Sequence, residues 1–510
     1  MNLTSEIELL PRDALLATAE PRCELISSFA ELEKLAPEWN RLWKCDPEAE
    51  VFQTFAWNRA WWLANAHHFE LCTLAAWDGD EVIGILPMAR KGSTLRFLGT
   101  PEADYADVIC EERNAVLCLT ITIRKLLEFK WWSECVLEHL SCNSRFVRHW
   151  KEMPRDVREC MAITPAGSCP TVLLGSEPGL LKKLADKKHL RRHETKLQKT
   201  APITFRLLKS GAEIEGVLPD FVRQQILRRE LLAETSSCQR PEFTALLHAL
   251  AQEQDLLEQM RFFVLEWEGR PLAYHLGFEA NSKFTMYQQT FNVGAWDYSA
   301  GEVLMRQLFL YADTRVTREF DFSVGEEGYK SRFANHFKPN FTVYIEARHL
   351  GGRLRRFQRK IQGRLVGPRA KLKQLIRDRS NVHRAAKYAR TWTAESYAMV
   401  RHRQEPETVS PMPATAEVQI AEGRLTDLAE LHLECPCFRL ATKLGTIKQR
   451  LKNGDRIYIV RQNGRPALLA WVRNPGSPAD TGRIFDQTFL DATRGKASAE
   501  ALEAFVRNLK

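Results

Sequence analysis

Two successive stretches of this 510-residue sequence show the same order of predicted elements, and this repetition limits the possible folds most strongly. Between residues 23 and 164, two amphipathic helices precede two alternating strands joined at Asp78-Gly79-Asp80, then a strand and a helix. From Pro170 the order recurs, with three strands joined at Glu268-Gly269 and Ala280-Asn281-Ser282. Strands joined by tight turns pair antiparallel, so the pattern predicts an α/β (α+β) fold with mixed, mainly antiparallel sheets.

The length of the chain favours several domains, because a single hydrophobic core rarely grows beyond about 250–300 residues. We expect an N-terminal unit at residues 20–165, a second unit at 170–349, a linker at 350–410 and a C-terminal unit at 415–510. The last unit repeats only the first part of the pattern. Such a half domain exposes a sheet edge, so we expect it to pack against the rest of the chain or a partner.

The net charge of +9 is concentrated in the linker, where residues 350–405 carry 16 Lys and Arg against three Asp and Glu. Apolar residues recur there at helical spacing between the basic ones: Leu354, Phe357, Ile361 and Leu365. This pattern predicts a basic amphipathic helix, broken at Gly367-Pro368. Its role stays open between a linker helix packed on the body, peripheral binding to an anionic inner membrane, and binding to nucleic acid.

The apolar fraction of 44% and the charged fraction of 27% are typical of a soluble globular protein. No signal peptide and no apolar run near 18 residues occurs, so we expect a cytoplasmic protein without an integral membrane span. The twelve cysteines form no CxxC pair, and Cys435-Pro-Cys437 is the closest spacing. We therefore expect reduced thiols and no metal.

Polar and ionisable side chains crowd one predicted strand-to-helix turn, FDFSVGEEGYKSRFA, at residues 320–334. In a strand, Asp321 and Ser323 share one face, and Phe320 and Phe322 share the other. If the Phe face is buried, Asp321 and Ser323 line a cleft. Gly325 then lets the backbone turn.

Three stretches carry a resemblance to a known family: HLRRHETKLQK, YSAGEVLMRQLFLYA and FDFSVGEEGYKSRFA. They resemble the acetyltransferase family named for CelD/BcsL, which is associated with bacterial cellulose and exopolysaccharide production and is related to the FemAB group. The last stretch is similar to the family pattern D-F-x-x-G-x-E-x-Y-K. The resemblance covers roughly residues 25–347 and implies a tandem pair of GNAT-like domains.

The resemblance implies acetyl transfer from acetyl-CoA to an amino or hydroxyl group of a small-molecule or glycan acceptor. It places the acyl-CoA pyrophosphate at the start of one helix, on Tyr298, Ser299, Ala300, Gly301 and Glu302. Backbone donors and the helix dipole favour an anion at such a position. Tyr298 stands where the family pattern has Arg or Gln, and Glu302 adds a negative charge.

Acyl transfer to an amine needs a base for the ammonium proton and an acid for the departing thiolate. Asp321 or Glu326 is the candidate base and Tyr329 the candidate acid, while Lys330 would hold an acidic substrate or the oxyanion. The alternative is that Asp321, Tyr329 and Lys330 form a buried structural network.

Two further groups are candidates for substrate binding. Asp104, Tyr105 and Asp107 follow a predicted strand and would position the acceptor in a groove between the units. Arg191 and Arg192 belong to a basic helix that is either a solvated face or an anion site.

Two other functions stay open beside acetyl transfer. A FemAB-like enzyme would take its acyl group from aminoacyl-tRNA, and a non-catalytic scaffold would serve a polysaccharide assembly. The sequence leaves the acceptor and the oligomeric state undetermined. His275, inside an apolar strand, is expected to be a core histidine with its hydrogen bonds satisfied.

Overall fold

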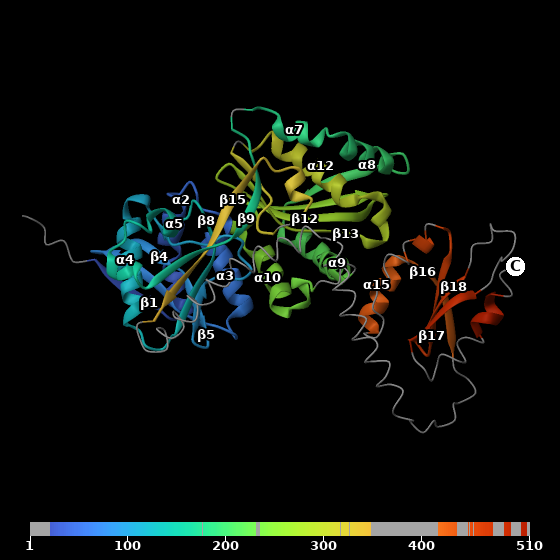
Figure 1. Ribbon diagram of the computed structural model, residues 1–510, viewed down its shortest axis with the longest axis horizontal. Helices are drawn as coiled ribbons and strands as arrows, with labels where there is room; N and C mark the ends of the chain where they lie inside the picture. Colours follow the sequence, from blue (N-terminus) through green and yellow to red (C-terminus); the bar gives the residue numbers. More distant parts are fainter. Residues whose placement is uncertain are drawn as a thin grey trace, which may run out of the picture.

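The computed structural model describes residues 21–347 and 417–506, apart from a few gaps: residues 176, 231–234, 317, 326, 436–446, 448, 452, 473–483 and 491–500 (Figure 1). The predicted basic helix at residues 350–405 lies outside the described residues. Among the residues that are described, no helix is both long and apolar enough to cross a membrane.

The first unit is built from helices around two sets of strands. Its helices are α1 (Phe29–Lys34), α2 (Ala36–Lys44), α3 (Phe55–Asn65), α4 (Ala115–Glu128), α5 (Arg145–His149) and α6 (Arg155–Arg158), with the 3-10 turns η2 (Val51–Gln53) and η3 (Glu112–Asn114). Its strands are β1 (Arg22–Ile26), β2 (Glu70–Leu71), β3 (Thr73–Asp78), β4 (Glu81–Leu86), β5 (Met88–Lys91), β6 (Thr94–Phe97), β7 (Ile109–Cys110) and β8 (Glu134–Ser141). The Thr54 hydroxyl caps α3 by accepting from the Trp57 N–H at 3.1 Å. Trp57 and Trp61 of this helix are buried in the core.

The second unit repeats this alternation after a long strand, β9 (Met161–Leu173). Its helices are α7 (Leu180–Ala185), α8 (Lys188–Gln198), α9 (Gly211–Glu230), α10 (Pro241–Gln252), α11 (Gln254–Leu257) and α12 (Ala300–Asp313), with the 3-10 turns η4 (Ser237–Gln239), η5 (Val293–Tyr298) and η6 (Lys330–Arg332). Its further strands are β10 (Ile203–Leu208), β11 (Met260–Trp267), β12 (Arg270–Ala280), β13 (Lys283–Phe291), β14 (Glu319–Asp321) and β15 (His336–Glu346).

One mixed sheet runs through both units, in the order β10-β11-β12-β13-β14-β9-β15-β8-β6-β5-β2. β9 pairs with β14 on one side and β15 on the other, and β15 pairs in turn with β8 of the first unit. The expected boundary near residues 165–170 therefore falls inside a strand, β9. A separate sheet in the first unit has the order β1-β3-β4-β7.

Helices cover both faces of the sheet in the second unit, with α7, α8 and α12 on one face and α9 and α10 on the other (Figure 1). The α9–α10 face continues into the core of the first unit, where α10 packs on α3. Aromatic rings join the units there: the rings of Phe52 and Trp57 each lie 5.7 Å from Phe278 and 5.5 Å from Tyr287. Such pairs add about 0.5–1.5 kcal/mol each beyond the area they bury.

The C-terminal unit contains α15 (Leu425–Glu434) and a four-stranded sheet of β16 (Val418–Gly423), β17 (Arg456–Gln462), β18 (Arg465–Val472) and β19 (Ile484–Phe489). Leu425, Leu428 and Leu431 of α15 share an apolar cluster with Leu227 of α9 and Val293 of η5. The unit therefore contacts the second unit through α15, as Figure 1 shows.

The segment before β10 forms two helices, α7 and α8, because the backbone of Lys187 between them is extended. The Lys187 ammonium donates to the Arg332 carbonyl at 2.9 Å. One local prediction was wrong. The helix expected to open at Tyr329 is only the 3-10 turn η6, because β15 already begins at His336. Gly325 does turn the chain, with φ +118°.

His275 lies in the core as expected, but its hydrogen bonds are not satisfied. The side chain is 0% exposed, and neither ring nitrogen has a partner among the described residues. The imidazole packs instead against the Phe284 ring, with centroids 5.6 Å apart. Burial lowers the pKa of His275 from 6.5 to about 3, because the charged ring would lose its hydration.

This histidine predicts acid-sensitive stability. As the pH falls from about 6.5 towards 3, the unfolded chain binds a proton at His275 while the folded chain does not, so folding becomes less favourable. Between pH 7 and pH 5, we expect the free energy of unfolding to fall by about 2 kcal/mol less in His275→Leu than in the wild type. Urea denaturation at both pH values measures this difference. Equal losses in the two proteins would contradict it.

Candidate acyl-transfer site

The sheet opens between β13 and β14, and this opening positions the site. The two strands pair in parallel only over residues 283–285 and 319–321. Beyond Asp321 the chain turns away through Ser323 and Gly325, both with positive φ. Because β13 continues to Phe291, its last residues lack a strand on this side within the described part of the chain. Their backbone groups are therefore available to an extended ligand.

A cavity of about 260 Å³ lies where this opening meets the start of α12. The residue before the helix, Ser299, has the left-handed conformation (φ +54°), and no side chain caps the helix. Ser299, Ala300, Gly301 and Glu302 line the cavity, as the sequence predicted for an anion-binding turn, while Tyr298 does not. Instead the Tyr298 ring packs on Trp267 at 4.8 Å, with the Lys196 ammonium 5.0 Å from its centroid.

Polar side chains of β13 and η6 face the same cavity. Thr290 is 2% exposed, and its hydroxyl has no hydrogen-bond partner among the described residues. The side-chain oxygen of Gln289 also has no hydrogen-bond partner among them. The Gln289 amide donates to the Tyr329 hydroxyl, which also lines the cavity. Burial and nearby Glu327 raise the pKa of Tyr329, so the phenol stays protonated at neutral pH. Unpaired polar atoms at a buried wall indicate room for a polar ligand.

Gln289 and Thr290 were not among the residues singled out from the sequence. Their only signal is the polar run Gln288-Gln289-Thr290 near the end of a predicted strand.

The charge that Glu302 brings to the start of α12 is balanced by two neighbours. Its carboxylate lies 3.1 Å from the Arg332 guanidinium and 3.3 Å from the His193 ring. His193 belongs to α8 and also lines a second, larger depression. The two hollows are therefore separated by one side-chain pair, His193 and Glu302.

This second depression, which we call the α8 groove, has a volume of about 850 Å³ and a basic lining. Arg191 and Arg192 line it together with other cations: Lys188, Lys196, Lys199 and Arg306. Arg306 is paired with Glu194 at 2.6 Å. No ion pair of Arg191 or Arg192 is seen among the described residues. Two of the predicted anion-binding residues therefore face a concave surface of matching charge.

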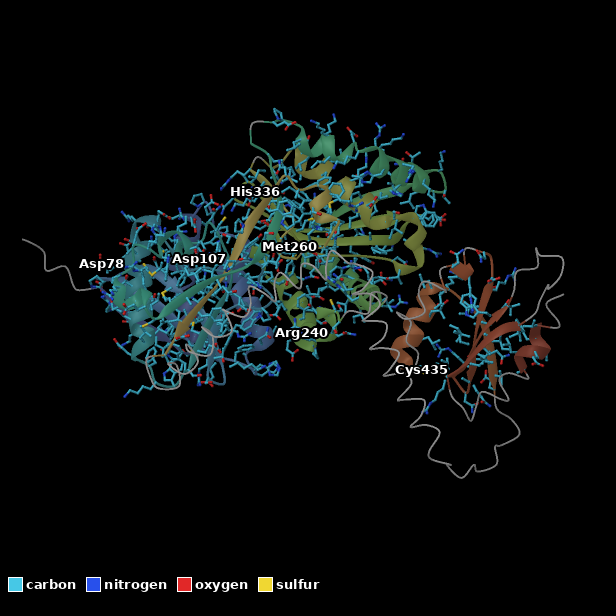
Figure 2. All side chains as sticks on the ribbon, viewed as in Figure 1. Asp78, Asp107, Arg240, Met260, His336 and Cys435 are labelled. Atoms are coloured by element: carbon cyan, nitrogen blue, oxygen red, sulfur yellow. The ribbon has the colours of Figure 1, made fainter. Side chains whose placement is uncertain are left out.

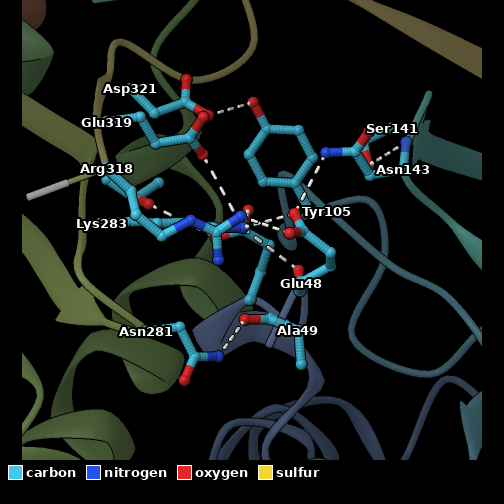
Figure 3. Close-up of polar contacts among 12 residues, drawn as sticks. Glu48, Ala49, Tyr105, Ser141, Asn143, Asn281, Lys283, Arg318, Glu319 and Asp321 are labelled. Atoms are coloured by element: carbon cyan, nitrogen blue, oxygen red, sulfur yellow. Dashed lines mark hydrogen bonds and ion pairs between the residues drawn. The ribbon is translucent and has the colours of Figure 1, made fainter. Parts of the chain in front are cut away.

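Asp321 does not line a cleft, contrary to the sequence-based expectation. The side chain is 0% exposed, and its carboxylate accepts from the Lys338 ammonium at 2.5 Å and the Tyr105 hydroxyl at 2.8 Å. The alternation rule failed because β14 is buried on both faces: Phe320 packs under α12, and Asp321 packs against the first unit. Figure 3 shows Tyr105 reaching Asp321.

Asp321 is part of a buried ion cluster between the two units, which we call the inter-unit cluster: Glu50, Lys283, Glu319, Asp321 and Lys338. Lys338 lies 3.2 Å from Glu319 and 3.8 Å from Glu50, and Lys283 lies 3.1 Å from Glu50 and 3.7 Å from Glu319. Burial opposes the charged ammoniums, but the carboxylates raise the pKa of both lysines above the usual value. The three carboxylates have oxygens within 4.8 Å of one another, as metal ligands do, yet two ammoniums already pair with them.

The cluster extends to the surface between the units (Figure 3). Arg318 pairs with Glu48 and donates to the Pro47 carbonyl at 2.8 Å. The Asn281 amide donates to the Ala49 carbonyl at 2.8 Å. The segment before η2 is thus tied to β13 and β14 by both charges and backbone acceptors.

The other predicted residues divide between structural and exposed positions. Lys330 is 5% exposed and donates to the Val324 carbonyl at 2.9 Å while pairing with Glu327, so it stabilises the turn instead of facing a substrate. Glu326 lies outside the described residues. Tyr329 is therefore the only one of the four predicted catalytic residues that lines the cavity within the described part of the chain.

The first-unit loop also differs from its expected role. Asp107, labelled in Figure 2, is buried and accepts from the backbone N–H groups of Arg145 and Phe146 at 2.5 and 3.4 Å, where α5 begins. Burial raises the pKa of Asp107 to about 7. Asp104 is partly exposed and accepts from the Ser323 hydroxyl at 2.6 Å, and burial of its carboxylate raises its pKa to about 6. Asp104 is thus the acid of this loop that reaches the end of β14.

One family model and several solved structures are similar to parts of this chain. Residues 185–331 match the family model described as "Acetyltransferase (GNAT) domain". No curated protein matches the sequence. Among solved structures, FemX is similar at 9% identity over 63% of this chain and 97% of that chain, with a TM-score of 0.44.

Two other similar structures were found. L-PGS from Bacillus licheniformis has 10% identity over 64% of this chain and 94% of that chain, with a TM-score of 0.40. A tandem GNAT protein from the clavulanic acid biosynthesis pathway has 11% identity over 64% and 98%, with a TM-score of 0.37. Residues 185–331 include α12 and most of the residues that line the cavity. The second unit therefore contains a match to a GNAT acetyltransferase domain, and this match supports an acyltransferase activity.

Proposed function

We propose that this protein transfers an acyl group from acyl-CoA to an amino or hydroxyl group, with the thioester end of the donor in the cavity at the start of α12. One observation carries the proposal. Inside the matched GNAT domain, the uncapped start of α12 lies beside buried polar atoms of β13 that have no partner among the described residues. The helix start suits phosphate, and Gln289 and Thr290 suit the amides of the pantetheine arm.

We assign the chemistry to two side chains, Tyr329 in the cavity and Asp104 beside the turn that follows β14. Attack of the acceptor on the thioester carbonyl forms the new bond to carbon and breaks the carbon–sulfur bond. Tyr329, protonated at neutral pH, gives its proton to the departing thiolate. We assign the base to Asp104, because its pKa of about 6 leaves it ionised at neutral pH and it reaches the end of β14.

We propose that the α8 groove receives the phosphates of the donor that do not lie at the start of α12. Enclosed ligand sites usually measure about 300–1,000 Å³, so the cavity of about 260 Å³ holds only part of a CoA molecule. The α8 groove begins on the other side of the His193–Glu302 pair and is lined by Arg191 and Arg192. These guanidiniums can bind phosphate oxygens bidentately.

Substitutions of Gly301 test the donor site. A Cβ at this position would meet only the Phe291 ring, at 3.6 Å, so Gly301→Ala keeps the fold. Gly301→Leu fills the cavity, and we expect it to weaken acetyl-CoA binding roughly 10- to 100-fold, or about 1.4–2.8 kcal/mol. Isothermal titration of both variants measures the effect. If Leu and Ala bind acetyl-CoA equally, or if the wild type gives no heat at millimolar ligand, the proposal fails.

A FemAB-like use of aminoacyl-tRNA is the second candidate, and the α8 groove favours it, because its cations suit a polyphosphate backbone. The same titration separates the two. Binding to aminoacyl-tRNA that is lost in Arg191→Ala, with no binding of acetyl-CoA, would replace the first proposal. Binding of neither donor would leave a scaffold role.

The acceptor class follows from the resemblance to the CelD/BcsL family, from which we propose a sugar or glycan of an exopolysaccharide pathway. The basic segment at residues 350–405 would hold the enzyme at an anionic inner-membrane surface. A flotation assay with and without this segment, on vesicles of anionic lipid, tests the second point. Vesicle binding that does not depend on the segment would disprove it.

A further inference from the structure

Two histidines and one glutamate meet where the two units touch, away from the acyl-transfer site. His67 and His68 follow the end of α3 in the first unit, and Glu242 is the second residue of α10 in the second. The His68 Nε2 atom lies 2.7 Å from a Glu242 carboxylate oxygen, and the rings of His67 and His68 have centroids 4.0 Å apart. Figure 1 shows α3 and α10 side by side, and Figure 2 labels Arg240 just before α10.

One donor atom from each of the three side chains lies within 4.8 Å of the other two. Ligands of a tetrahedral zinc ion bind at about 2.0–2.2 Å, so small side-chain rotations bring these donors to a shared ion. Two imidazoles and one carboxylate are a ligand set that suits Zn²⁺ and leaves a fourth position to water. Hard cations such as Mg²⁺ prefer oxygen and do not match it.

The charges around the three side chains differ from those of the inter-unit cluster. There, Lys338 and Lys283 already occupy the space between the carboxylates. Around Glu242, by contrast, no Lys or Arg forms an ion pair with the carboxylate among the described residues, and its one ion-pair partner is His68. Among the described residues, lysines therefore balance the inter-unit carboxylates, whereas neither a lysine nor an arginine pairs with Glu242.

We propose that His67, His68 and Glu242 bind a divalent transition-metal ion, with Zn²⁺ as the ion that suits the donors, and that the ion joins α3 of the first unit to α10 of the second. Arg59 of α3 already pairs with Glu253, the residue that follows α10, at 2.6 Å. A metal held by both units binds the docked arrangement and not the unfolded chain, so it stabilises the docked arrangement.

The test uses the full-length protein, stripped of metal with a chelator, and ZnCl₂ as the probe. The variants are His67→Ala, His68→Ala and Glu242→Gln. His248→Ala is the matched control, because His248 lies 2.5 Å from Glu215 without a second histidine. We expect the wild type and the control to bind one more equivalent of Zn²⁺ than the site variants. Loss of a hydrogen-bond partner of a metal ligand lowers metal affinity by roughly 10- to 100-fold, so loss of a ligand itself should lower it by at least as much.

A spectroscopic readout separates this site from binding at the cysteines. Co²⁺ at a nitrogen and oxygen site gives visible absorption without a thiolate charge-transfer band, and this signal should vanish in His67→Ala and persist in His248→Ala. Zn²⁺ should also raise the unfolding temperature of the wild type but not of Glu242→Gln. Equal stoichiometry, equal affinity and equal temperature shifts across all variants would overturn the proposal, whatever the outcome of the acetyl-CoA titration.

Discussion

Replacing Lys338 by methionine is expected to lower the free energy of unfolding by about 3–5 kcal/mol, the cost of removing one partner from a buried ion pair. The ammonium of Lys338 is 2.5 Å from Asp321 and 3.2 Å from Glu319, and the side chain is 4% exposed. Without it, only Lys283 remains to balance the three carboxylates of the inter-unit cluster. Thermal and urea denaturation of the full chain measure the loss.

Two further measurements make this prediction specific to the cluster. The loss should be smaller at pH 5 than at pH 8, because a proton taken up by one of the crowded carboxylates replaces part of the missing charge. Adding Asp321→Asn to Lys338→Met should restore part of the stability. Lys125→Met, which removes an exposed pair with Glu128, serves as the control and should change stability by less than about 0.5 kcal/mol. A loss as small as that of the control would contradict the electrostatic explanation.

Replacing Tyr329 by phenylalanine is expected to lower the rate of thiol release from acetyl-CoA by about 10²- to 10⁴-fold, the usual contribution of general acid catalysis. The ring and its packing are kept, so acetyl-CoA affinity should change by less than about tenfold. Tyr298→Phe is the matched control, because the Tyr298 ring packs on Trp267 and its residue does not line the cavity. A parallel loss in both variants would contradict the assignment of the acid.

The pH dependence of the reaction rate tests the proposed base. With a pKa of about 6, Asp104 binds a proton as the pH falls through 6, so the rate of the wild type should fall there. Asp104→Asn should remove this dependence and lower the rate at neutral pH. If the variant keeps the acidic limb of the profile, another group is the base.

Much of the fold was predictable because its signals are local. The hairpin turns at Asp78-Gly79 and Glu268-Gly269 correctly marked antiparallel neighbours, β3–β4 and β11–β12. The continuous sheet was not predictable, because β9 and β15 pair with strands on both sides of the expected boundary. No pattern in a single strand specifies which distant strand will lie beside it.

The site was predicted in part for the same reason. The small residues Ser299, Ala300 and Gly301 predict a helix start that suits an anion, and they line the cavity together with Tyr329. Asp321 was misplaced because alternation assumes that one face of a strand is exposed. Its true neighbours, Tyr105 and Lys338, come from elsewhere in the chain, and nothing near Asp321 in the sequence reveals them.

The shared strands β9 and β15 also bear on how such a chain can change in evolution. β15 closes the second unit yet lies in the middle of the sheet beside β8 of the first, so neither unit keeps all its strand partners without the other. Exchange of one unit between related genes would leave unmatched edges on both products. We therefore expect the two units to be inherited and replaced as one block. The surface at the start of α12 and along α8 can diverge more freely, and such changes would give new substrates to an unchanged scaffold.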